Sequence, residues 1–309
     1  MRIELEGVGI RSGSNHTHQE INLLWQGPGL FLVTGSSGAG KSRLLRLLAG
    51  LASFEGSMSR EYQGCGYLPQ LFSFYSNLTP IDFLDYLLLL EGVTERRQRA
   101  RIIQVLIARA DLDRQARLRL GNLPLSARQR IAIVQSLIGN PECLIWDEPE
   151  QNLRTSGQDW LQTIIEKETK ERLLIIASAN VVLYEQMAVR IAVLHDGRLV
   201  FEGSREQLLA SAEGQVWEGK IPFKQWQKFR LENIVTQADI VDGGILVRVL
   251  GQSEYEYVGF EPVPGTASDA VELLIQAASL PGVQNKGIQG LENSSSKGQK
   301  QGNRKGLWR

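Results

Sequence analysis

Residues 35–42 read Gly-Ser-Ser-Gly-Ala-Gly-Lys-Ser, which matches in full the pattern of a phosphate-binding P-loop. An apolar run at residues 30–33 precedes the loop, and a pattern typical of an amphipathic helix follows it at residues 41–51. In such a strand–loop–helix unit, glycines let successive backbone N–H groups surround a phosphate, and the helix N-terminus adds positive potential. We therefore predict that ATP is bound by Gly35, Ser36, Ser37, Gly38, Ala39, Gly40, Lys41 and Ser42. Lys41 would reach the β- and γ-phosphates, and the Ser42 hydroxyl would ligate Mg²⁺.

A pair of acids supplies the second half of a nucleotide site. Asp147 and Glu148 directly follow the apolar residues 143–146, which read as a buried strand. Asp147 would support Mg²⁺ through water, and Glu148 would act as the general base for an attacking water molecule. Two surface carboxylates at the end of a strand are the alternative, and the P-loop upstream favours the site.

The order of apolar segments predicts the fold class. Predicted strands at 30–33, 144–146, 173–177 and 191–194 alternate with predicted helices, and their continuous apolar runs indicate an α/β protein with a parallel sheet covered on both faces. Thr79, Pro80 and Asp82 form a strong helix start and open a helical segment that extends to about residue 137. We expect a nucleotide-binding domain over residues 1–218 and a small α+β domain over 219–283. The second domain is expected to include an amphipathic stretch near 223–229, a strand at 245–249 and a helix at 267–279.

Composition excludes some functions. Lys+Arg and Asp+Glu both total 34, so no excess of positive charge indicates a nucleic-acid binder. No apolar run approaches the roughly 18 residues that span a bilayer, so any membrane association would be through a partner. The chain has only two cysteines, and Cys143 falls in an apolar strand pattern, so a buried thiol in a reducing cytosol is expected. Residues 284–309 are polar and basic and are expected to be a disordered, solvated tail, with loose contact to anionic lipid or RNA as the alternative.

Two further segments carry a resemblance to a known family. Residues 66–70 (Gly-Tyr-Leu-Pro-Gln) with 78–86, and residues 191–203, are similar to the glutamine loop with its following helix and to the late strand–hairpin of ABC transporter ATPases, closest to subunits of ABC-2-type exporters. The resemblance implies a P-loop NTPase fold with a RecA-like core and a helical subdomain at about 72–137. It also implies that Gln70 contacts Mg²⁺ and water. The implied partners are an integral membrane permease and a second ATP-binding subunit, which would place the chain on the inner face of the cell membrane.

The chain departs from that family at several motifs. The signature motif, usually Leu-Ser-Gly-Gly-Gln, falls on residues 123–127 (Leu-Pro-Leu-Ser-Ala) or, with a two-residue gap, on a segment beginning at Leu125. Arg154 stands where the family has Asp, Ala179 falls on the switch histidine, and no aromatic lies near Ser12 to stack on adenine. His16 and His18 are expected to be solvated, as is His195, in a turn. Binding should persist while hydrolysis is impaired, because phosphate and Mg²⁺ contacts use the intact segments.

Three functions remain open at this point. The first is an ABC-2-type transporter ATPase with weak hydrolysis, as a homodimer or, preferably, a heterodimer with an ordinary ATPase. The second is a non-hydrolysing, nucleotide-gated regulatory or scaffold module of a membrane complex. A soluble ABC-related protein of translation or DNA repair is the third, although paired nucleotide domains, coiled coils and zinc-type cysteine pairs are lacking in the sequence.

Overall fold

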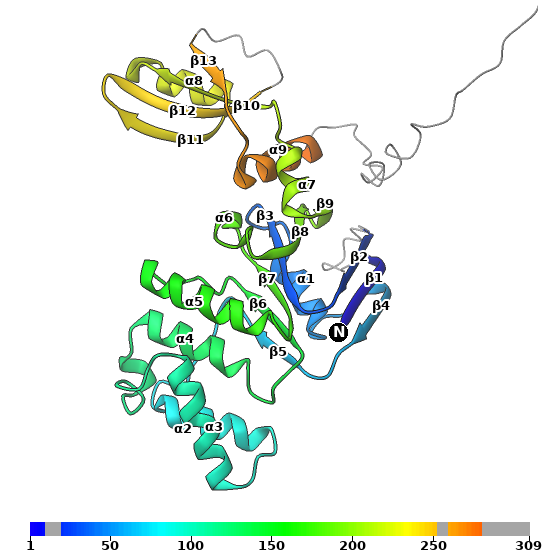
Figure 1. The fold of residues 1–309 in the computed structure, drawn as a ribbon, viewed down its shortest axis with the longest axis vertical. Helices are drawn as coiled ribbons and strands as arrows, with labels where there is room; N and C mark the ends of the chain where they lie inside the picture. Colours follow the sequence, from blue (N-terminus) through cyan, green and yellow to red (C-terminus); the bar gives the residue numbers. More distant parts are fainter. Residues whose placement is uncertain (10–19, 252–258, 280–309) are drawn as a thin grey trace, which may run out of the picture.

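A six-stranded sheet forms the centre of the molecule, in the order β5-β6-β7-β3-β8-β9 (Figure 1). The computed structural model describes residues 1–9, 20–251 and 259–279. Neighbouring strands are parallel except β9, which runs antiparallel to β8. The predicted α/β class with a parallel sheet is therefore confirmed. The six strands are β5 (Cys65–Leu68), β6 (Cys143–Asp147), β7 (Leu173–Ala177), β3 (Gly29–Gly35), β8 (Ala188–His195) and β9 (Arg198–Gly203).

Each face of this sheet is buried in a separate core, because side chains alternate along a strand. Phe31 and Ile145 belong to the core that contains α1 (Lys41–Leu48), while Leu32 and Trp146 belong to the core that contains α4 (Leu125–Gln135) and α5 (Thr155–Glu168). β3, β6 and β7 are buried at every residue. Burial on both faces explains why these strands read as continuous apolar runs.

A three-stranded antiparallel sheet covers part of the α1 side. Its order is β2 (Ile21–Gln26), β1 (Arg2–Gly9), β4 (Glu55–Glu61). Trp25 is fully buried and its ring centroid lies 5.2 Å from that of Phe31, which joins the two sheets. β4 was not predicted, since its sequence Glu-Gly-Ser-Met-Ser-Arg-Glu carries no apolar alternation.

The helical region consists of α2 (Pro80–Leu90), α3 (Arg96–Arg109), the short 3-10 helix η1 (Leu120–Asn122) and α4. Thr79 accepts a hydrogen bond from the backbone N–H of Asp82 at 3.1 Å, and Asp82 accepts one from that of Thr79 at 3.2 Å. This capping box is the reason that α2 begins where the sequence predicts. Within the part of the chain that the structure describes, no helix has both the length and the apolar character needed to cross a membrane.

The C-terminal part forms an antiparallel sheet in the order β11-β12-β10-β13, above the main body in Figure 1. The boundary expected at residue 218 falls inside β10, so this sheet begins at Val216. A strand cannot be divided between two domains when its whole length pairs with β12. The elements of this part are β10 (Val216–Ile221), η2 (Phe223–Gln225), α8 (Trp226–Glu232), β11 (Ile234–Val241), β12 (Gly244–Leu250), β13 (Phe260–Pro262) and α9 (Ala267–Ser279).

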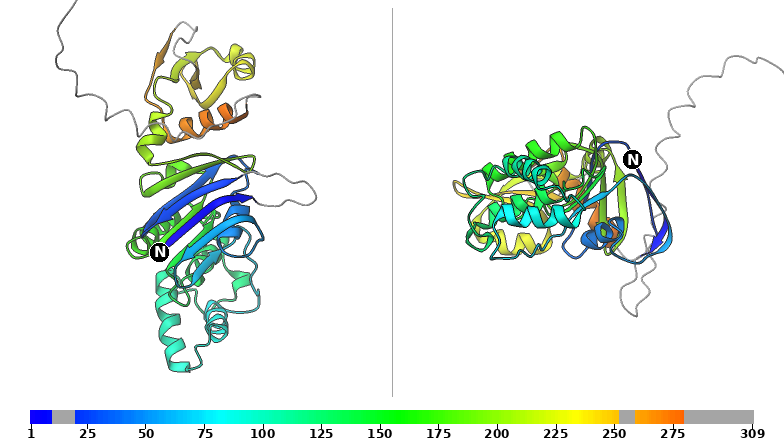
Figure 2. Two further views of the ribbon diagram at one scale, coloured as in Figure 1. Left: turned by 90° about the vertical axis from the view of Figure 1, so that its right-hand side faces the viewer. Right: turned by 90° about the horizontal axis from the view of Figure 1, so that it is seen from below.

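Helix α9 lies between the C-terminal sheet and the main body (Figure 2, left). It contacts β11 on one side and α6 (Val181–Tyr184), α7 (Arg205–Ala210) and β8 on the other. Its Ala270 and Val271 share one hydrophobic core with Leu208 of α7 and Ile191 of β8. The C-terminal segment is thus packed onto the main core through α9, and the tail expected at 284–309 lies outside the described residues.

Asp269 connects α9 to the C-terminal sheet. Its side chain is 1% exposed and accepts hydrogen bonds from the Thr236 hydroxyl at 2.6 Å and the Arg248 guanidinium at 2.8 Å. It also accepts hydrogen bonds from the backbone N–H and hydroxyl of Thr266. Burial alone would raise the pKa of Asp269, but these donors together lower the pKa below its usual value.

We expect Asp269→Asn to lower the free energy of unfolding by about 2 kcal/mol at pH 7, because hydrogen bonds to a charged acceptor are lost. The contribution of Asp269 should be complete above about pH 4, the range of an unfolded Asp, and should decline as the pH falls toward the lower folded pKa. Chemical denaturation from pH 3 to 7 measures both effects. Asp159→Asn, at an exposed site on α5, is the matched control, and equal stability of the two variants would contradict the prediction.

Candidate functional site

The P-loop joins β3 to α1, as the sequence predicts. Its glycines adopt backbone conformations that other residues rarely take, with φ of 136° at Gly35, 79° at Gly38 and 99° at Gly40. Gly35 has a second reason to be glycine, because an added Cβ would collide with the carbonyl oxygen of Leu194 on β8. The loop is therefore curled at the carboxyl ends of parallel strands, where ligands of such sheets bind.

Lys41 is turned back into this loop. Its side chain is 7% exposed, and Nζ donates to the carbonyl oxygens of Gly35 at 2.9 Å and Ser36 at 3.0 Å. Burial lowers the pKa of Lys41, while the charges of Glu148, Asp147 and Glu150 act in the opposite direction. A triphosphate would add negative charge next to this buried ammonium group and would stabilise its charged form.

Asp147 and Ser42 come together across the sheet. Asp147 is 2% exposed at the end of β6, and the Ser42 side chain lies close enough to influence its pKa. Burial raises the pKa of Asp147, helped by Glu148, and Ser42 and Lys41 oppose it. Its Oδ1 is buried and, among the described residues, has no hydrogen-bond partner. A hydroxyl and a carboxylate with one unsatisfied buried oxygen form the kind of hard oxygen donor set that Mg²⁺ takes, either directly or through water.

Gln70 and Glu148 meet from two separate segments. β5 and β6 pair in register, with Leu68 opposite Trp146, so that Gln70 emerges beside the acid pair. The Gln70 side-chain amide donates to Glu148 Oε2 at 2.8 Å. Glu148 has φ of 48°, and its backbone N–H donates to the carbonyl of Ala177 at 2.8 Å. This left-handed residue turns the chain sharply at the end of β6.

The end of β7 lies between the P-loop strand and the acid-pair strand. β7 pairs with β3 on one side and β6 on the other, and Ser178 donates its backbone N–H to Val33 at 3.0 Å. Ala179, which the family resemblance aligned with a switch histidine, is exposed just beyond. The methyl side chain there can neither donate nor accept a proton.

Part of the signature segment and Arg154, two of the departures from the family's motifs, are also exposed. Pro124 occupies the N-cap position of α4 without a side-chain cap, and Leu125 is 59% exposed. Arg154 is exposed at the start of α5. Residues 10–19, which hold Ser12, His16 and His18, lie outside the described residues.

His195 was expected to be exposed in a turn, and this prediction was wrong. The residue ends β8, and its side chain is 16% exposed because α9 packs beside it. Its Nε2 lies 3.0 Å from the Ser279 hydroxyl. Sequence reasoning placed this histidine correctly beside a hairpin but had no signal for the distant helix that covers it.

Glu150 is a site residue that sequence reasoning missed. It lies two residues beyond Glu148, and its carboxylate accepts hydrogen bonds from the hydroxyls of Ser178 and Tyr184, both fully buried. In the sequence, Glu150 could have been noticed as a third carboxylate next to the acid pair. Its hydrogen-bond partners, however, lie 28 and 34 residues away in the sequence.

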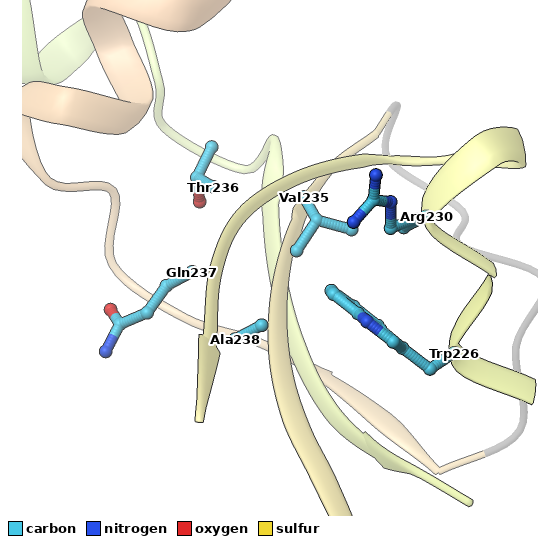
Figure 3. Close-up of a pocket in the computed structure, with 6 residues that line it drawn as sticks. All are labelled: Trp226, Arg230, Val235, Thr236, Gln237 and Ala238. Carbon is cyan, nitrogen blue, oxygen red and sulfur yellow. The ribbon is translucent and has the colours of Figure 1, made fainter. Parts of the chain in front are cut away.

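A hollow of about 310 Å³ lies far from this site, in the C-terminal sheet. Figure 3 shows the Trp226 ring of α8 facing Val235 of β11, with the Arg230 side chain beside them. Thr236, Gln237 and Ala238 complete its wall. These side chains do not resemble a phosphate site, and the P-loop remains the candidate.

Comparison with known proteins agrees with the site geometry. The ABC transporter family matches residues 19–151. The ABC transporter ATP-binding protein YxlF of Bacillus subtilis is 28% identical over 193 residues, which is 60% of this chain and 65% of that relative, so the match spans a little under two thirds of its length. The bacitracin transport ATP-binding protein BcrA of Enterococcus faecalis is 26% identical over 85% of this chain and 82% of its own. The solved dimer of an ATP-binding cassette bound to ADP and Pi superposes with a TM-score of 0.59 at 19% identity, covering 66% of this chain and 98% of that one.

We expect Lys41→Ala to abolish the increase in thermal stability caused by Mg-ATP, because the buried cation that faces the phosphates is removed. For the wild-type chain, ATP at about 100 times its Kd should add roughly 2.7 kcal/mol of stability. Differential scanning fluorimetry with and without Mg-ATP measures the change, and Lys167→Ala, on the exposed side of α5, should retain it. An undiminished shift in Lys41→Ala would show that the nucleotide binds elsewhere.

Proposed function

Because this chain belongs to the family of ABC transporter ATP-binding proteins, we propose that it serves as the ATP-binding subunit of an ABC transporter of the ABC-2 type. In this proposal, ATP binding and weak hydrolysis are coupled to a membrane permease. The relative named for bacitracin transport supports the exporter type.

One observation carries the proposal. The Lys41 ammonium is buried in a glycine loop. Ser42 and the carboxylate of Asp147 lie beside it, and Oδ1 of that carboxylate has no hydrogen-bond partner among the described residues. Such an arrangement supplies a cation for the phosphates and oxygen ligands for Mg²⁺. Bound Mg²⁺ would neutralise charge that develops on the phosphates.

Glu148 is the proposed general base. It is held at one carboxylate oxygen by Gln70, which leaves the other to accept a proton from an attacking water molecule. Gln70 begins the segment that leads to the aromatic cluster of Phe72, Phe74 and Phe83 in the helical region. A change at Glu148 is thereby connected to the surface on which a permease would bind.

Hydrolysis is proposed to be slow in a homodimer. Ala179 provides no imidazole, and the helix that would face a partner's phosphate begins with Pro124 and Leu125 in place of Ser and Gly. The loss of one such group typically lowers turnover by a factor of about 10² to 10⁴. In a heterodimer with an ordinary ATPase subunit, one site would lack the imidazole and the other would lack the Ser and Gly of the facing helix. We favour this heterodimer. The chain would then lie on the inner face of the membrane, attached through the permease.

A nucleotide-gated module without hydrolysis is the second candidate, favoured by the methyl group at residue 179. It would bind Mg-ATP at the same residues and would alter a membrane complex through binding alone. The two candidates differ only in phosphate release, which the next experiment measures.

We expect the purified chain to bind Mg-ATP but to release phosphate at well below about 1 s⁻¹, the lower end of typical enzyme turnover. The rate of phosphate release should rise when the chain is co-purified with a second ATPase subunit and a permease encoded by neighbouring genes. Lys41→Ala sets the background in each case. A fast rate for the chain alone, abolished by Lys41→Ala, would contradict impaired hydrolysis, and background rates in every complex would favour the second candidate.

A further inference from the structure

Glu150 stands in a connection between the two segments that flank the phosphate site. The loop after β6 carries Glu148 and Glu150, and the segment after β7 carries Ser178 and, in α6, Tyr184. One backbone hydrogen bond joins these segments, from the Glu148 N–H to Ala177. Further along the loop, the carboxylate of Glu150 links the two segments through side-chain hydrogen bonds.

Both oxygens of this carboxylate are used. Oε1 accepts from the Ser178 hydroxyl, and Oε2 accepts from the Tyr184 hydroxyl at 2.7 Å. Ser178 Oγ in turn accepts from the backbone N–H of Asn180 at 2.9 Å, so Ala179 is enclosed between two residues of the same network. Hydrogen bonds from the acid-pair loop therefore fix the position of residues 178–180.

The charges and hydrogen bonds around Glu150 favour a structural role for its carboxylate over a role in proton transfer. Burial raises the pKa of Glu150, whereas the Ser178 and Tyr184 hydroxyls lower it by stabilising the ionised form. Burial and the nearby Glu150 charge raise the pKa of Tyr184, so its hydroxyl remains a donor. One hydroxyl donor is directed at each oxygen, so both oxygens of this carboxylate are engaged within the protein.

We propose that Glu150 is a positioning residue: its carboxylate fixes the acid-pair loop to the end of β7 and so holds Glu148 in place although residue 179 carries no imidazole. The inference rests on the proposed ATP-binding function and names a further residue of the same site. Glu150 acts through Glu148 and the segment 178–180 and touches no phosphate itself.

The experiment compares two substitutions at one position. Glu150→Ala removes both hydrogen bonds, whereas Glu150→Gln keeps the shape and can satisfy both hydroxyls, with its amide oxygen accepting from one and its amide group donating to the other. Phosphate release is followed as kcat and KM, well below the melting temperature of each variant. Glu168→Gln is the control, because Glu168 is a buried, multiply bonded glutamate outside the site, paired with Arg109 and Arg172.

We expect Glu150→Ala to lower kcat by about 10²-fold, the effect of misplacing a reacting group by about 1 Å, with KM changed less than about threefold. Glu150→Gln should recover most of that loss, and Glu168→Gln should lower the melting temperature without changing kcat. Unchanged kcat in Glu150→Ala would reduce Glu150 to a stabilising residue. Equal loss in Ala and Gln would show that the charge itself is needed. Either result overturns the proposal.

Amide hydrogen exchange separates this proposal from the proposed function. In Glu150→Ala, exchange should increase both in 148–153 and in 177–184, while Glu150→Gln should resemble the wild type. Should the wild-type chain release phosphate only at the Lys41→Ala background, the hydrolytic function fails by itself. Wild-type exchange in both segments of Glu150→Ala overturns the positioning role independently of turnover.

Discussion

The buried ammonium group of Lys41 is the interaction on which the site depends. It lies at the end of a fully buried strand, bonded to the carbonyls of Gly35 and Ser36, with the charges of Glu148, Asp147 and Glu150 raising its pKa against the effect of burial. A cation in such a position is stable only where opposite charge or dipoles surround it. The glycine conformations of the loop, the packing of β3 and the end of β6 all contribute to that surrounding. The triphosphate is then expected to join an existing balance of charge, with Mg²⁺ compensating the carboxylates beside it.

The order of the strands explains why substitutions at one strand end affect the others. β7 lies between β3 and β6, so its last residues contact both the P-loop strand and the acid-pair strand. Ala179 follows directly at this central place. In this chain, the same segment is fixed through Ser178, Tyr184 and the carboxylate of Glu150. The segment thus keeps a defined position even though the side chain suited to proton handling is missing.

Local patterns predicted the elements that carry the site, and long-range packing decided what could not be predicted. The P-loop between a strand and a helix, the cap at Thr79 and the helix at 267–279 depend on residues a few positions apart, which a sequence displays directly. The family resemblance pointed to Gln70 as a ligand of Mg²⁺ and water, and its hydrogen bond to Glu148 is known only from the structure. By contrast, β4 has no apolar pattern because it is held by pairing with β1, and His195 is covered by a helix that begins over 70 residues later. The Glu150 network escaped prediction for the same reason, since hydroxyl donors such as Tyr184 are found only through the fold.

The packing of α9 connects the C-terminal segment to the phosphate site without a direct contact. The turn after β8 donates the N–H of Gly197 to the carbonyl of Ala39 in the P-loop at 2.9 Å. Two residues earlier, His195 lies against Ser279 at the end of α9, and Asp269 near the start of α9 bonds to β11 and β12. The bonds of Asp269 are partly buried, whereas the contact of His195 with Ser279 is exposed. A continuous chain of contacts therefore leads from the C-terminal sheet through α9 and β8 to the loop that surrounds Lys41.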